Sequence, residues 1–136
     1  MTPESERYLA KARLTLQHAR TMLTVNLTED AGRAAYLASY QAAEALIFEH
    51  RGKATKSHKG MHTEFARITR AEPRIDPELR RFLPQAYDLK SICDYEVGPD
   101  AVVPFEKAEA AVSMAARFLD RIEEILANPS AKETKS

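Results

Sequence analysis

Residues 28–50 read TEDAGRAAYLASYQAAEALIFEH, and this stretch decides the fold class. Alanines recur in it at spacings of three and four, which places them on one face of a helix with 3.6 residues per turn: Ala31, Ala35, Ala38, Ala42 and Ala45. A second apolar stripe runs beside the first, at Tyr36, Tyr40, Ala43 and Ile47. A helix with two apolar stripes is covered on two sides. We therefore expect a central helix that opens around Thr28 and ends before Gly52.

Four further helices are expected around this one, and their starts are marked by capping residues. Thr2, Ser57 and Asp76 are N-cap candidates, and Pro104 opens the last helix. Between these marks, apolar residues keep helical spacing over 9–23, 61–68 and 79–93. The last helix carries the clearest stripe: Phe105, Ala108, Val112, Ala115, Leu119, Ile122 and Leu126. The pattern predicts an all-α domain of about five helices over residues 1–127, followed by a disordered polar tail at 128–136.

Composition limits the class of protein further. The chain has 136 residues, enough for one domain, and its 20 basic residues balance its 20 acidic ones. Cys93 is the only cysteine, so no internal disulfide can form and a reducing compartment is favoured. There is no apolar stretch typical of a signal peptide or a membrane span. We expect a soluble cytoplasmic protein with no membrane association.

Charge is uneven along the chain, although its total is balanced. Residues 51–74 contain seven Lys or Arg against two acids, and His58 and His62 add to the basic character. Residues 94–126 reverse the balance, with eight acids against three Lys or Arg. The simple interpretation is two solvated faces of opposite sign. The alternative is an anion-binding or RNA-phosphate surface around the third helix.

The sequence lacks the phosphate-loop, dinucleotide, HExxH and nucleophile-elbow motifs, and we expect no cofactor. His58 and His62 are four residues apart on one helical face, and Glu64 is the only nearby third ligand for a metal. Two histidines on either side of Lys59 are more simply part of the basic segment, so we predict no metal site. Cys93 has the spacing of a core residue and is expected to behave as a small hydrophobe.

Two stretches resemble the HEPN family of small bacterial and archaeal proteins. The first runs from Ala35 to Leu46 and continues to Ser57, His58, Lys59 and Gly60, ahead of Phe65. The second is the end of the fourth predicted helix, where Lys90, Ser91, Ile92, Cys93, Asp94 and Tyr95 are similar to the family's Arg-x-x-Ala-Asp-Tyr ending. The order and separation of the motifs match over roughly 125 residues.

This resemblance implies an up-and-down helical bundle that forms a homodimer and is often encoded beside a minimal nucleotidyltransferase in toxin-antitoxin-like systems. Many family members are metal-independent ribonucleases, in which an Arg and a following His, with four to six residues between them, form the catalytic pair. Here Lys90 takes the arginine position, and no histidine follows it in the chain. The spacing recurs as Arg13 with His18, on a different helix, and as Arg51 with His58. Arg51 and His58 are the candidates for a displaced catalytic pair.

Three functions are therefore kept open. The first is a dimeric HEPN-type module that binds a nucleotide, RNA or a nucleotidyltransferase partner through Ser57, His58, Lys59, Lys90, Asp94 and Tyr95. The second is an active endoribonuclease toxin that uses His58 as its acid or base. The third is a scaffold bundle whose charges only keep it soluble. Whether the protein is an enzyme is left undecided by the sequence.

Overall fold

The computed structural model describes residues 1–99 and 102–129, and it contains five helices. They are α1 (Pro3–Thr24), α2 (Thr28–Arg51), α3 (His58–Thr69), α4 (Pro77–Tyr95) and α5 (Phe105–Ala127). The described residues form no strand, so the all-α prediction is confirmed. None of the helices in this part of the chain combines the length and apolar content needed to cross a membrane.

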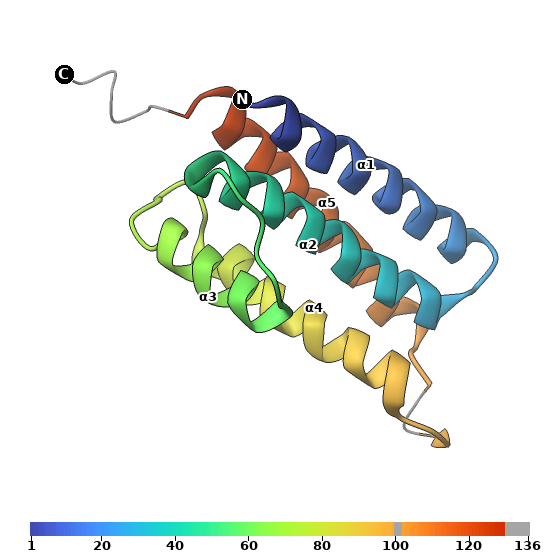
Figure 1. Ribbon diagram of the computed structural model, residues 1–136. Coiled ribbons are helices and arrows are strands. Elements are labelled where there is room, and N and C mark those ends of the chain that lie inside the picture. The colour runs from blue at the N-terminus through green and yellow to red at the C-terminus, as the bar shows by residue number, and fades with distance from the viewer. Residues whose placement is uncertain (100–101, 130–136) are drawn as a thin grey trace.

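α2 is the central helix of the bundle, and it packs against all four others. Figure 1 shows α1 and α5 along one side of it and α3 and α4 along the other. Successive long helices α1, α2, α4 and α5 alternate in direction, which is the up-and-down arrangement (Figure 1). The stripe of alanines explains the close packing, because all five of them are buried: Ala31, Ala35, Ala38, Ala42 and Ala45.

The helix ends follow the local signals in the sequence. The side chains of Thr2, Ser57 and Asp76 accept hydrogen bonds from the backbone N–H three residues later, at 3.1, 2.9 and 2.8 Å. Gly52 ends α2 with φ of 75°, a left-handed conformation that suits glycine, and its N–H donates to the carbonyl of Phe48 at 2.8 Å. α2 and α5 start without a side-chain cap, after Leu27 and Pro104.

The last helix corrects one predicted core residue. The α5 stripe is buried from Ala108 to Leu126, but Phe105 is 39% exposed. Phe105 is the first residue of α5, and Val103 in the preceding connection is buried in the core at 3% exposure. Of the predicted polar tail, residues 130–136 lie outside the described residues, while Asn128 accepts a hydrogen bond through its carbonyl from Arg74.

Candidate functional site

The two motifs of the sequence come together on one side of the bundle, between the start of α3 and the second half of α4. The ring of Tyr87 lies 5.4 Å from that of His58, measured between centroids. The Lys90 ammonium lies 6.0 Å from the Tyr87 ring centroid and 5.9 Å from that of Tyr95. These four residues, called the α3–α4 row below, form a chain of contacts from His58 to Tyr95.

Tyr95 gives the α3–α4 row its exposed end. It is the last residue of α4, and 74% of its surface is open to solvent. Exposing an aromatic ring to solvent costs free energy, and this ring gains no packing in the core in return. Its ring contacts Lys90, and its large exposed surface leaves the tyrosine ring available to a ligand.

Asp94 fixes the end of α4 to the start of α2. Its carboxylate accepts hydrogen bonds from the Lys90 ammonium and from Arg33 Nε, both at 2.7 Å. Arg33 also bonds Asp30 and donates to the carbonyl of Cys93 at 3.0 Å. The hydrogen bond from Lys90, helped by Arg33, lowers the pKa of Asp94, and the same bond raises the pKa of Lys90. The ion pair with Asp94 therefore fixes the position of the Lys90 side chain and partly neutralises its charge.

The connection before α3 is anchored by a buried carboxylate of α2. Glu44 of α2 is only 1% exposed, and its carboxylate accepts hydrogen bonds from the backbone N–H (3.2 Å) and the hydroxyl of Thr55. Two residues later Ser57 caps α3 through Gly60. Glu44 thus anchors the connection that leads into Ser57, His58 and Lys59.

His58 is held by a buried tyrosine. The hydroxyl of Tyr36, a residue only 2% exposed, lies 2.8 Å from Nδ1 of His58 and 3.1 Å from Nε2 of His62. The Tyr87 ring stands 5.3–5.4 Å from the rings of all three residues. Burial raises the pKa of Tyr36 well above its usual value, so its hydroxyl keeps its proton. Burial, and secondly the neighbouring His58, lowers the pKa of His62.

Three of the four arginines in the basic segment, residues 51–74, form ion pairs, whereas Arg70 and the lysines form none among the described residues. Arg51 and Arg67 pair with Glu64, and Arg74 pairs with Glu72. Lys53, Lys56 and Lys59 are exposed, and none of the acids in the described residues forms an ion pair with them. Their charges are therefore uncompensated, and all three lie within five residues of His58 in the sequence.

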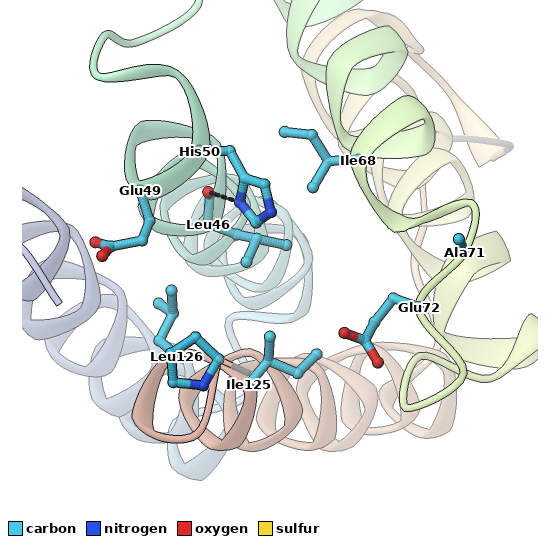
Figure 2. A pocket seen from close by; sticks show the side chains of 9 residues that line it. Leu46, Glu49, His50, Ile68, Ala71, Glu72, Ile125 and Leu126 are labelled. Carbon is cyan, nitrogen blue, oxygen red and sulfur yellow. Dashed lines mark hydrogen bonds between the residues drawn. The ribbon is translucent and has the colours of Figure 1, made fainter. Parts of the chain in front are cut away.

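A pocket of about 400 Å³ lies elsewhere, where α2, α3 and α5 end. Figure 2 shows Leu46, Ile68, Ile125 and Leu126 forming its apolar part, with His50 between them. Its polar groups are used within the protein: Nδ1 of His50 donates to the carbonyl of Leu46 at 3.1 Å, Glu49 accepts from the backbone of Thr2, and Glu72 bonds Arg74. We do not assign this pocket to the site.

The sequence matches the HEPN domain family over residues 5–125. The chain belongs to the HEPN family. It is 28% identical over 127 residues to the UPF0332 protein glr0978 of Gloeobacter violaceus, a match that covers 93% of this chain and 99% of that protein. The crystal structure of TT1696 from Thermus thermophilus has a TM-score of 0.70 to this HEPN chain at 21% identity, covering 90% of this chain and 98% of the other. The structural similarity to TT1696 supports the helical fold.

This HEPN chain does not bring Arg51 and His58 together in a direct contact. The guanidinium of Arg51 lies 3.8 Å from Glu64, which is six residues beyond His58 and so roughly 9 Å further along α3. His58 instead contacts Tyr36, Tyr40 and Tyr87. Glu64, the third metal ligand considered, is turned toward the two arginines, and no group of three potential metal ligands occurs among the described residues.

Four residues of the candidate site cannot be recognised from the sequence alone. Arg33, Tyr36, Glu44 and Tyr87 each look like an ordinary member of a helix face. The signal for Arg33 is its position three residues after Asp30, with which it pairs. The signal for Glu44 is a charged residue inside an otherwise apolar stretch.

Proposed function

We propose that this HEPN protein is a binding module for single-stranded RNA or nucleotides, with the α3–α4 row and the turn Ser57–Lys59 as its binding surface. The observation that carries the proposal is the position of Lys90 between the rings of Tyr87 and Tyr95. Tyr87 in turn contacts His58, so the two motifs, some 30 residues apart in the sequence, meet through Tyr87 and Lys90.

The chemistry of the surface suits an unpaired base followed by its phosphates. An aromatic face stacks on any nucleobase, which contributes about 1–3 kcal/mol per base in single-strand binding proteins. Tyr95 offers such a face. Because Asp94 partly neutralises Lys90, attraction of the phosphates falls to Lys53, Lys56 and Lys59. The surface thus divides into a stacking end and a phosphate end.

The same proposal includes the partners that the family resemblance implies. We infer a homodimer, and a nucleotidyltransferase protein as a partner in a toxin-antitoxin-like system. A cytoplasmic location belongs to the proposal, because RNA and nucleotides are found there and the single Cys93 suits a reducing compartment. Co-purification with the protein encoded by the neighbouring gene, followed by light scattering of the complex, tests the partner and the dimer.

The binding surface is tested with a fluorescent 12-nucleotide single-stranded RNA and fluorescence anisotropy. Tyr95→Ala removes the exposed ring, and we expect a loss of affinity of about 5- to 150-fold. Lys59→Ala should lower the slope of log affinity against log salt by about 0.7. Lys11→Ala, the same charge change on α1, is the matched control and should leave binding unchanged. Equal behaviour of all three variants, or no binding and no thermal shift with nucleotides, favours the scaffold function instead.

A second candidate is an endoribonuclease in which His58 is the acid or base. The observation that favours it is the hydrogen bond between Tyr36 and Nδ1 of His58, which fixes the ring and leaves Nε2 free for proton transfer. RNA cleavage and growth arrest on expression, both lost in His58→Ala and kept in His18→Ala, would establish it. Intact RNA after long incubation with the wild type would reject it.

A further inference from the structure

One hydroxyl group lies between two histidines in this protein. Tyr36 has one O–H donor, and its oxygen can accept hydrogen bonds. The distances of 2.8 Å to His58 and 3.1 Å to His62 mean that the hydroxyl serves both rings at once. The hydroxyl therefore donates its proton to a nitrogen of one ring, and the N–H of the other ring donates to the hydroxyl oxygen.

The number of protons on the two rings limits this arrangement. With both rings neutral, each hydrogen bond has one donor and one acceptor. One added proton is accommodated, because the protonated ring donates to the Tyr36 oxygen and the hydroxyl donates to the other ring. A second proton makes both rings donors, so the Tyr36 O–H is left without an acceptor in a buried position, which is unfavourable. Repulsion between two imidazolium groups adds to this cost.

The surroundings decide which ring holds the added proton. His62 is half-buried, and burial opposes a charge there, whereas His58 is exposed. The ionisable groups that act on the two rings are Tyr36 and Tyr40 of α2 and Tyr87 and Asp88 of α4, and Lys59 follows His58 in the chain of α3. Asp88 is the one acid among them, and it favours a charge on His62, but less than burial opposes it. The proton thus belongs on His58, whose Nε2 is not engaged by Tyr36.

We propose that His58, Tyr36 and His62 hold a single shared proton, and that this proton switches on the binding of phosphate groups at the start of α3. The proposal rests on the proposed function and adds its regulation: the protein binds RNA more tightly as the pH falls below neutrality. His58 then supplies a cation beside Lys56 and Lys59, with its ring fixed by Tyr36.

The proton-sharing half is tested by NMR titration of the labelled imidazole nitrogens between pH 8 and pH 5, without RNA. We expect His58 to take up one proton while His62 stays neutral. Tyr36→Phe keeps the ring but removes the hydroxyl, and His62 should then become easier to protonate. Simultaneous protonation of both histidines in the wild type, or titrations unchanged by Tyr36→Phe, would overturn the shared proton.

The effect of the proton on RNA binding is tested by calorimetry. The protein is titrated with the same 12-nucleotide RNA in buffers of different ionisation enthalpy. Binding at pH 7 should take up close to one proton, and the affinity should fall about tenfold per pH unit above the midpoint of proton uptake. His58→Ala should abolish the uptake, and His18→Ala should keep it. Binding without proton uptake refutes the switch and leaves the proposed function intact. No binding at any pH refutes the proposed function and the effect of the proton on RNA binding, while the NMR result stands by itself.

Discussion

Nε of Arg33 lies 2.7 Å from Oδ1 of Asp94, which bonds the start of α2 to the end of α4. The other carboxylate oxygen of Asp94 holds Lys90, also at 2.7 Å. Arg33 and Asp94 are 61 positions apart in the sequence. Their contact sets the orientation of the last turn of α4, with Tyr95 at its end.

Asp94→Asn should destabilise the fold modestly and loosen the end of α4. The Asp94 side chain is 21% exposed, so the lost charge–charge bonds should cost about 1 kcal/mol, well below the value of a fully buried pair. Urea unfolding measures this loss, and Glu109→Gln on the exposed face of α5 is the control.

The pH dependence gives a second readout for Asp94. Its pKa is lowered in the folded state, so it stabilises the protein at all pH values above its ordinary pKa of about 4. This contribution is lost as the pH falls through the folded value. Asp94→Asn should therefore flatten the acid limb of the stability curve, and an unchanged limb would show that the ion pairs do not form in solution.

Glu44→Ala should free the connection between α2 and α3. Its buried carboxylate is the acceptor for both the N–H and the hydroxyl of Thr55, and its loss leaves these donors unpaired at a cost of about 1–3 kcal/mol. Hydrogen exchange of the Thr55 amide should become faster in the variant. A double-mutant cycle with Thr55→Val isolates the interaction. Additive effects of the two substitutions would contradict the anchoring role.

The helices could be predicted from the sequence because their signals are local. A cap such as Ser57 acts on Gly60, three residues away, and an apolar stripe needs only the helical period. Phe105 shows the limit of the period, because it continues the α5 stripe and still lies outside the core, whereas Val103 is buried without any helical signal.

The site was only partly predictable, because its contacts depend on how the helices rotate against one another. Periodicity places Tyr36 on the apolar face of α2, but the hydrogen bonds to His58 and His62 span 22 and 26 residues. The sequence motif names Lys90, Asp94 and Tyr95 as candidates, but it gives no indication of Tyr87, which links Lys90 to His58. A single sequence specifies which face is apolar and leaves the partner of each side chain open.

Gly32→Ala should leave the protein as stable as the wild type or stabilise it by up to about 0.5 kcal/mol. Alanine is favoured over glycine in a helix by about 1 kcal/mol. A Cβ at this position would lie 3.3 Å from Cδ2 of Leu89 and 3.4 Å from Sγ of Cys93, so these side chains must shift slightly and part of the gain is lost. Urea unfolding provides the measurement.

Gly32→Val is the matched test of how closely α2 and α4 pack. Its two additional methyl groups have no free space beside Leu89 and Cys93, so overpacking should cost about 1–3 kcal/mol. If valine is tolerated as well as alanine, the two helices lie further apart in solution than in this structure.

Acidification from pH 7.5 to 5.5 should destabilise the protein through His62. Burial and the neighbouring His58 lower the pKa of His62 in the folded state, whereas the unfolded chain takes up the proton near pH 6.5. The contribution of His62 to stability is therefore complete above pH 6.5 and is lost as the pH falls toward the folded value. His62→Phe keeps a ring beside Tyr87 and removes this titration, so its unfolding free energy should change less over the same range. Urea unfolding at each pH measures the difference, and His18→Asn, on the exposed face of α1, should retain the wild-type slope. A His62→Phe slope equal to that of the wild type would mean that another group, outside the Tyr36 cluster, controls the acid sensitivity of the fold.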